Sequence, residues 1–266
     1  MPLRFRNVLV SCGFAFALLC PGAAFAGTVV VDAGRGNVTV RVPGGGSPPY
    51  PLVVYLHGFN TDAAVDDSAY LTALVAAIDS TLGVDPHRIY FVGHSNGGFM
   101  SYRFACDHAD RVAAVVSIAG ATFDDPADCA PLRPVSTLQI HGTSDAVIQY
   151  GGGTLPGADG PYPAAAETAS TWAAYNGCES SAVSLAPFDG LDGLPGEETG
   201  VERYASGCSG AVTELWTVTG GQHSPAINDT LRDRVIAFLV AAGNRVFEDG
   251  FETGFTFAWS SSVGEL

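Results

Sequence analysis

The sequence predicts an α/β domain with a mostly parallel sheet and helices on both of its faces. Three observations indicate this fold class. Short apolar runs rich in β-branched and aromatic residues alternate with stretches of helical periodicity. The pattern G-x-S-x-G at residues 93–97 joins one of these runs to a helix-forming segment. The chain has 266 residues, of which 47% are apolar, which is enough for one domain with a sizeable core.

The first 26 residues are typical of a secretory signal peptide. Arg4 and Arg6 precede an apolar run, and Ala-Phe-Ala at residues 24–26 matches a cleavage site. A membrane anchor is the alternative, but the run ends at Pro21 and is too short to span a bilayer well. We therefore expect a secreted protein, extracellular or periplasmic, without stable membrane insertion. The rest divides into one domain at 27–243 and an acidic, aromatic tail at 244–266.

The domain is expected to begin with a hairpin. Residues 28–32 and 37–42 alternate in polarity like two strands, and a Gly-rich turn separates them. A loop rich in Gly and Pro then leads to an apolar strand at 52–57, and helical sequence follows at 66–78. The next apolar run, at 89–93, is the strand that enters the G-x-S-x-G pattern.

The elements after this pattern are assigned from the same periodicities. We expect helices at 98–105 and 229–242, strands at 112–118, 135–141 and 214–218, and Gly- and Pro-rich loops that flank the site at 151–163 and 186–200.

The G-x-S-x-G pattern predicts a nucleophile elbow with Ser95 at its centre. A turn this tight between a strand and a helix holds the central residue in a strained conformation, so small residues must flank it. The alternative is a Gly-rich turn that contains a serine by chance, since the chain has 33 glycines. The apolar strand before the motif and the helix after it favour the elbow.

A serine nucleophile needs a base and an orienting carboxylate, which follow in the order Ser, Asp or Glu, His in this kind of fold. Asp145 comes just after the strand at 135–141, and His223 comes just after the strand at 214–218. Both positions lie at the carboxyl edge of a parallel sheet, where active sites form. His223 is the histidine that fits this order. An Asx turn at Asp145 and a structural loop histidine at 223 are the alternatives.

An oxyanion hole requires two backbone N–H donors. Asn96, directly after the nucleophile, is expected to supply one. Phe59, in the loop after the strand at 52–57, is expected to supply the other. His57 precedes the elbow and has no role in the triad order, so we interpret it as structural.

Five motifs stand out along the chain: HGF at 57–59, VDPHRIY at 84–90, GHSNGG at 93–98, HGTSD at 141–145 and WAAYNGC at 172–178. Together they resemble the secreted polyhydroxybutyrate depolymerase and feruloyl esterase group of α/β-hydrolases, over roughly residues 50 to 240. The resemblance implies the α/β-hydrolase fold, a serine ester hydrolase that works through an acyl-enzyme, and no cofactor. It also implies a substrate that is a small-molecule or polymeric ester: a polyester, a hydroxycinnamoyl or acetyl sugar ester, or a short-chain ester.

The chain departs from this family pattern in two places. The family usually has Trp two residues after the catalytic histidine, where this chain has Ser224-Pro225. Family members also carry a helix, a strand and a long loop after the HGF motif, whereas here residues 60–65 lead straight into the next helix. We therefore expect a fold one βα unit shorter. Because an unpaired central strand would leave backbone groups without partners, we expect residues 37–42 to pair antiparallel with 52–57.

Removal of the signal peptide leaves four cysteines, an even number that predicts disulfides in an oxidising compartment. Three pairings are possible. We favour Cys106 with Cys129 and Cys178 with Cys208, because each pair flanks one segment between core elements and the family resemblance implies the same. A zinc site is the alternative, but the spacing of the cysteines and histidines does not support a metal site.

The charge argues against some classes of partner. The formal net charge is −15, every basic residue is Arg, and cleavage after residue 26 leaves 10 − 27 = −17. Such a surface is unsuited to nucleic acid or anionic membranes. The alternative function is a non-catalytic binding protein, or a degenerate copy, on the same fold, and the missing βα unit is the observation that favours it. The oligomeric state does not follow from the sequence.

Overall fold

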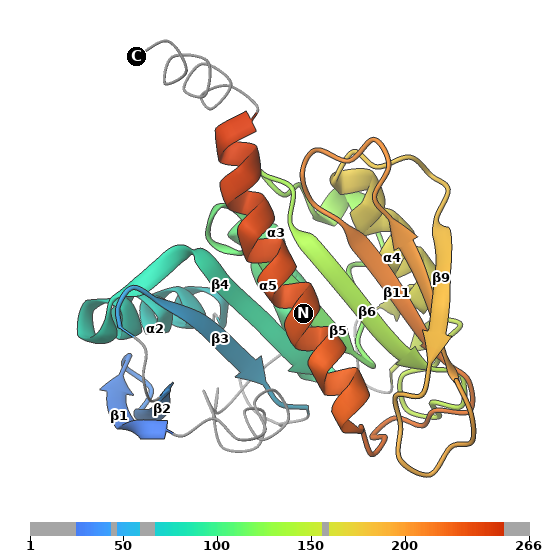
Figure 1. The fold of residues 1–266 in the computed structure, drawn as a ribbon, viewed down its shortest axis with the longest axis horizontal. Helices are drawn as coiled ribbons and strands as arrows, with labels where there is room; N and C mark the ends of the chain where they lie inside the picture. Colours follow the sequence, from blue (N-terminus) through green and yellow to red (C-terminus); the bar gives the residue numbers. More distant parts are fainter. Residues whose placement is uncertain (1–24, 44–46, 59–66, 156–159, 253–266) are drawn as a thin grey trace.

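The computed structural model describes residues 25–43, 47–58, 67–155 and 160–252 (Figure 1). In chain order the strands and helices are β1 (Phe25–Asp32), β2 (Asn37–Pro43), β3 (Tyr50–Leu56), α2 (Asp67–Leu82), β4 (Val84–His94), α3 (Asn96–Asp107), β5 (Ala114–Ile118), β6 (Ser136–Gly142), β7 (Gly153–Thr154), β8 (Pro161–Tyr162), α4 (Ala165–Tyr175), β9 (Val183–Phe188), β10 (Thr199–Tyr204), β11 (Thr213–Val218) and α5 (Asp229–Glu252).

The central sheet has seven strands in the order β3-β4-β5-β6-β11-β10-β9. The first five of these are parallel to one another, and near the far edge β10 pairs antiparallel with both β11 and β9. Helices lie on both faces of the sheet (Figure 1). The expected fold class, a mostly parallel sheet between helices in the α/β-hydrolase arrangement, is confirmed.

Alternate residues of the central strands supply the two halves of the core. Phe91 and Val115 pack against α2, α3 and α4 on one face, whereas Val92 and Val116 pack against α5 on the other. Successive side chains of a strand point to opposite faces, so fully apolar strands indicate burial on both faces. In Figure 1, α5 crosses in front of the sheet and the other helices lie behind it.

In the described part of the crossover from β3 to β4 there is one helix, α2, as the short spacing in the sequence predicts. This is sterically sound because one helix can join two adjacent parallel strands in a right-handed crossover. The register places Leu56 beside Gly93, so β3 ends next to the start of the elbow.

The expected pairing of residues 37–42 with 52–57 is wrong. Strand β2 pairs with β1 in a separate two-stranded sheet, and among the described residues β3 pairs with β4 alone. The hairpin turns its buried valines toward the core on the α2 side of the sheet. Arg35 in its turn forms an ion pair with Asp67 of α2, with Nη1 2.6 Å from Oδ1, and lies over the Tyr70 ring. These contacts hold the hairpin against α2.

Other elements differ in extent from the expectation. The segment 186–200, expected to be a loop, includes the last residues of β9 and the first residues of β10. The segment 151–163 contains the short strands β7 and β8, which pair with each other. Helix α4 is not among the elements that the sequence analysis predicts. Helix α5 continues to Glu252 and so includes the first residues of the expected tail. Residues 1–24 of the expected signal peptide and residues 253–266 lie outside the described residues.

In the part of the chain that the structure describes, no helix is both long and apolar enough to cross a bilayer.

Candidate active site

Ser95 occupies the turn between β4 and α3. Its backbone has φ +55° and ψ −122°, a conformation that residues other than Gly rarely adopt. Three backbone hydrogen bonds fix the turn: Ser95 N–H donates to the Ile118 carbonyl at 2.8 Å, and the Ser95 carbonyl accepts from Gly98 and Phe99. Strain held by surrounding bonds in this way is typical of a functional site.

The two glycines of the motif are required by close backbone contacts. A Cβ atom on Gly93 would overlap the backbone of Gly97, and one on Gly97 would overlap the carbonyl of Leu56 in β3. Helix α3 therefore begins directly against β3 and β4, which holds Ser95 above the edge of the sheet.

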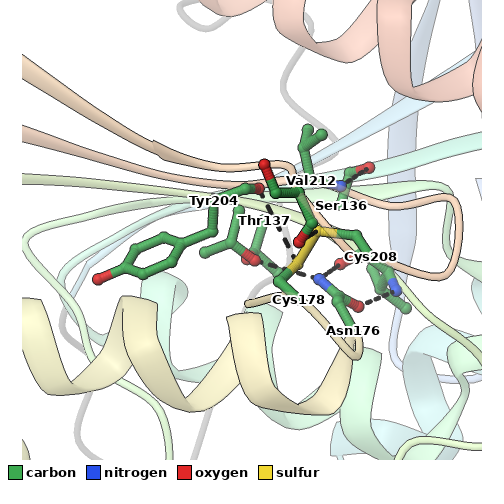
Figure 2. The surroundings of a disulfide bond; sticks show 10 residues. Ser136, Thr137, Asn176, Cys178, Tyr204, Cys208 and Val212 are labelled. Atoms are coloured by element: carbon green, nitrogen blue, oxygen red, sulfur yellow. Dashed lines mark hydrogen bonds between the residues drawn. A yellow bond between two sulfur atoms is a disulfide. The ribbon is translucent and has the colours of Figure 1, made fainter. Parts of the chain in front are cut away.

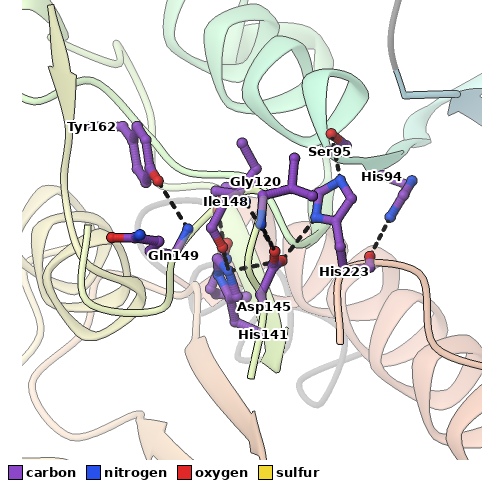
Figure 3. Close-up of polar contacts among 11 residues, drawn as sticks. His94, Ser95, Gly120, His141, Asp145, Ile148, Gln149, Tyr162 and His223 are labelled. Atoms are coloured by element: carbon purple, nitrogen blue, oxygen red, sulfur yellow. Dashed lines mark hydrogen bonds and ion pairs between the residues drawn. The ribbon is translucent and has the colours of Figure 1, made fainter. Parts of the chain in front are cut away.

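His223 lies in the loop that follows β11, and its ring bridges Ser95 and Asp145 (Figure 3). The ring atom Nδ1 is 2.8 Å from Asp145 Oδ2, and Nε2 is 3.0 Å from Ser95 Oγ. A carboxylate can only accept, so Nδ1 carries the hydrogen and Nε2 is free to accept the serine proton. The structure thus brings together the three residues that the sequence order selects.

Asp145 is held from several directions. Its Oδ1 accepts hydrogen bonds from the Val147 and Ile148 amides at 2.8 and 2.9 Å, while Oδ2 receives His223. The side chain is fully buried. Burial alone would raise the pKa of the carboxyl, but the hydrogen bonds from His141, His223 and the Val147 amide outweigh it and lower the pKa to about 2.

Behind Asp145 lies a buried chain of hydrogen bonds that sequence reasoning missed. Tyr102 Oη donates to Gln139 Oε1, and Gln139 Nε2 donates to His141 Nδ1 at 3.1 Å. His141 Nε2 therefore carries the hydrogen, which it donates to the Ile148 carbonyl at 2.8 Å, with Asp145 Oδ2 at 3.5 Å. This chain sets the position of the loop that carries the carboxylate.

His94 was likewise given no role by the sequence, because it precedes the nucleophile. Its Nε2 is 2.7 Å from the carbonyl oxygen of His223, and the two rings lie 5.0 Å apart (Figure 3). The signal that could have found both residues is their place in the motifs: His94 is next to Ser95, and His141 is four residues before Asp145.

Of the two expected oxyanion donors, the structure describes one. Asn96 is the first residue of α3, so its N–H belongs to a first turn whose amides have no partner within the helix. Phe59 lies outside the described residues. Its neighbour Gly58 packs on the nucleophile so closely that a Cβ there would be 3.0 Å from the Ser95 Cβ. His57 Nδ1 is 2.8 Å from the Gly58 carbonyl oxygen.

The four cysteines form the two pairs that the sequence analysis favours. Cys106 is bonded to Cys129, and Cys178 to Cys208. The second bond joins the segment after α4 to the turn between β10 and β11 (Figure 2). Beside it the Asn176 side chain exchanges two hydrogen bonds of 2.9 Å with the backbone of Val135, so this end of α4 is fixed to the entry of β6. Within the described ranges, no group of three or more His, Cys, Asp or Glu side chains is placed to hold a metal ion.

A family model described as alpha/beta hydrolase fold matches residues 70–239. The chain therefore belongs to the α/β-hydrolase family. It is 33% identical to feruloyl esterase B of Piromyces equi over an alignment of 173 positions that covers 62% of this chain and 30% of that protein.

Two further relatives extend this comparison. The chain is 32% identical to the putative esterase NocK of Nocardia uniformis subsp. tsuyamanensis (62% of this chain, 51% of that protein). It is 28% identical to feruloyl esterase D of Neurospora crassa (74% and 63%). Less than two thirds of each of these three relatives is matched. The expected resemblance to an esterase group of α/β-hydrolases is confirmed.

Proposed function

We propose that this protein is a secreted serine hydrolase of carboxylic esters that works through an acyl-enzyme. The observation that carries the proposal is the hydrogen-bonded series Ser95, His223 and Asp145 at a strained elbow. Nucleophile, base and orienting acid within hydrogen-bond reach of one another form the arrangement that acyl transfer requires.

In the proposed reaction, Ser95 Oγ attacks the ester carbonyl carbon while His223 Nε2 takes its proton. Asp145 holds the ring with Nδ1–H toward the carboxylate and stabilises the imidazolium that forms. The oxyanion accepts a hydrogen bond from the Asn96 amide at the start of α3, together with the amide predicted for Phe59. His223 then protonates the leaving alcohol, and the same groups activate water to release the acid.

The substrate class is proposed from the relatives and from the motifs. Two of the three relatives are named feruloyl esterases, and the motifs resemble the group that includes polyhydroxybutyrate depolymerases. We propose hydroxycinnamoyl or acetyl esters of plant polysaccharides, or polyesters, as substrates. The chemistry described needs no cofactor.

Secretion is proposed from two features of the chain. The first 26 residues have the composition of a signal peptide. The two disulfides suit an oxidising compartment, because cytosolic thiols are kept reduced.

The test is turnover combined with active-site labelling. The purified chain is assayed on p-nitrophenyl acetate and butyrate, methyl ferulate, acetylated xylan and amorphous polyhydroxybutyrate, and is treated with a fluorophosphonate. We expect hydrolysis of at least one ester and labelling of Ser95 detected by peptide mass spectrometry. Ser95→Ala should lower kcat by about 10⁶, because the triad acts as a unit.

Ser170→Ala is the matched control, since Ser170 is an exposed residue of α4. It should behave like the wild type. A wild-type protein that neither hydrolyses any of these esters nor reacts with the fluorophosphonate would favour the alternative, a non-catalytic binding protein on the same fold.

A further inference from the structure

His94 touches each of the three parts from which the proposed active site is assembled. It directly precedes Ser95 in the chain, at the end of β4. Its side chain reaches the backbone carbonyl of His223, across 129 residues of sequence. Its Nδ1 atom faces the loop after β3, where a Cβ on Gly58 would lie 3.2 Å from it.

The proton positions on the His94 ring follow from its partner. A carbonyl oxygen can only accept, so Nε2 of His94 carries the hydrogen in the 2.7 Å contact with the His223 carbonyl. Nδ1 of the neutral ring then carries no hydrogen. Burial lowers the pKa of His94, and the hydrogen bond to His223 only partly opposes this. A neutral ring at this position adds no positive charge beside His223 when His223 becomes an imidazolium during the reaction.

The loop that carries His223 depends on this contact. The start of the loop is fixed by the Gly221 carbonyl, which accepts a hydrogen bond from the Ser144 amide. Its end is fixed by the Ala226 carbonyl, which accepts from the Asp192 amide. Between them lie residues 222–225. Among the hydrogen bonds of the described residues, the bond from His94 is the one that reaches the backbone of that segment.

We propose that His94 is a positioning residue that locks the His223 loop onto the nucleophile elbow, through the hydrogen bond from its Nε2 to the His223 carbonyl. The bond fixes the backbone from which the imidazole projects, and so fixes the 3.0 Å contact between Nε2 of His223 and Ser95 Oγ. The same ring also lies against Gly58 in the loop after β3. His94 therefore contacts both the loop that carries His223 and the loop after β3, at the position next to the nucleophile. His94 itself does not touch the reacting atoms.

This inference rests on the proposed function, and it predicts a specific kinetic signature. Loss of the bond misplaces the base, not the substrate, so kcat falls while KM is kept. Misplacement of a catalytic group by about 1 Å costs on the order of 10²-fold. We therefore expect a decrease in kcat of about 10- to 100-fold.

The test compares variants that differ in reach. In His94→Gln the amide nitrogen extends to the place of Nε2 and can still donate, whereas in His94→Asn the side chain is one methylene shorter and stops short of the carbonyl. His94→Leu has similar bulk and no donor. His87→Leu is the control, because His87 is an exposed histidine on the same strand, seven residues before His94. Each variant is measured for kcat and KM on the best p-nitrophenyl ester, for the rate of fluorophosphonate labelling at Ser95, and for its thermal midpoint.

We expect His94→Asn and His94→Leu to lose about 10- to 100-fold in both kcat and labelling rate with KM nearly unchanged, and His94→Gln to stay within about threefold of the wild type. The proposal is overturned if the Asn variant is as active as the Gln variant, or if the loss appears in KM. If the Leu variant does not fold, the Asn and Gln pair decides. An inactive, unlabelled wild type would refute the proposed function, whereas an active wild type with equally active variants refutes the role of His94 alone.

Discussion

At the scale of single residues, the surroundings of Asp145 explain why its carboxylate stays ionised although it is buried. It is fully buried, yet its two oxygens accept from two backbone amides and the His223 ring, with His141 close by. A buried carboxylate is stable only when hydrogen bonds replace its lost hydration. The bonds that keep Asp145 ionised also fix its position. The loop after β6 therefore determines the orientation of the His223 ring.

The lowered pKa of Asp145 predicts a particular sensitivity to acid. The pKa is about 2 in the folded chain and 3.8 in its usual environment, so ionised Asp145 stabilises the fold above about pH 4. That contribution is lost as the pH falls toward 2, because the unfolded chain binds the proton first. We expect Asp145→Asn to have a lower thermal midpoint than the wild type at pH 5, and the difference to shrink as the pH approaches 2.

Asp124→Asn removes an exposed carboxylate and serves as the control for this titration. Its thermal midpoint should follow that of the wild type at every pH. A difference between wild type and Asp145→Asn that is the same at pH 5 and pH 2 would show that the ionisation of Asp145 does not stabilise the fold.

The sequence predicts Ser95, Asp145 and His223 because their order and their places after strands are local features. It gives no role to His94 or His141, whose partners are set by the tertiary fold. The contact from His94 crosses from β4 to the loop after β11, and these strands are not neighbours in the sheet. A position in a motif indicates that such a residue matters, but only the packed structure shows which group it holds.

At the scale of elements, the elbow depends on how closely α3 approaches β3. The helix begins at Asn96, directly after the strained serine, and Gly97 meets the backbone of Leu56 with no room for a side chain. The backbone of β3 cannot yield at this point, because Leu56 is almost fully buried. The helix would have to move away, and Ser95 would move with it.

Gly97→Ala is therefore expected to destabilise the fold and weaken the site. Overpacking of a rigid contact costs roughly 1–3 kcal/mol, and we expect the upper part of this range because backbone cannot rotate away. The thermal midpoint and the fluorophosphonate labelling rate at Ser95 should both fall. Gly151→Ala is the matched control, since a Cβ there meets nothing within 4 Å. Equal effects of the two substitutions would show that α3 does not abut β3.

The disulfide between Cys178 and Cys208 is also a property of elements, because it ties α4 to the β10–β11 turn. It closes a segment of 30 residues, and a loop of this size gives about 3–4 kcal/mol in the chain-entropy account. Replacement of both cysteines by serine should lower the free energy of unfolding by that order. Digestion without reductant should release Cys178 and Cys208 peptides as one linked species. A Cys129–Cys178 peptide would contradict the pairing.

Elements with strong periodicity are predicted from the sequence, and elements in Gly- and Pro-rich stretches are not. The strands that carry the site are short runs rich in β-branched and aromatic residues, and β6 is buried along its whole length. Strand β9 has five exposed residues and a proline, so nothing in its composition separates it from a loop. Helix α5 extends beyond residue 242, where the sequence predicts its end, as far as Glu252.

At the scale of the whole molecule, the central sheet has two unlike faces. Helix α5 covers one face, while α2, α3 and α4 cover the other, together with the β1–β2 hairpin. The sequence places residues 37–42 close to β3 because a short connection joins them. It does not show that the buried side of the hairpin fits α2 better than its backbone would pair with β3. The competition between side-chain burial and strand pairing is a property of the whole fold.

The position of the hairpin leads to a prediction that one pair of substitutions can test. Val40 is 3% exposed and belongs to the core cluster on the α2 side of the sheet, whereas Val30 on the paired strand is 57% exposed. If the hairpin is part of the cooperative core, Val40→Ala should lower the free energy of unfolding by roughly 1–3 kcal/mol through the cavity that it leaves. Val30→Ala removes the same atoms from the same hairpin and should change the free energy by less than about 0.5 kcal/mol.

Both variants are measured by urea unfolding, followed by far-ultraviolet circular dichroism and by tryptophan fluorescence. Trp172 is fully buried in the same cluster as Val40, and Trp216 is buried in the cluster on the α5 side, so the fluorescence reports on both sides of the sheet. A single transition that shifts to lower urea for Val40→Ala in both signals is expected, because a docked hairpin unfolds together with the core. If the two substitutions have equal effects, or if Val40→Ala changes the circular dichroism without moving the fluorescence transition, the hairpin does not share the core with α2. The pairing with β3 that the connection length suggests would then have to be reconsidered.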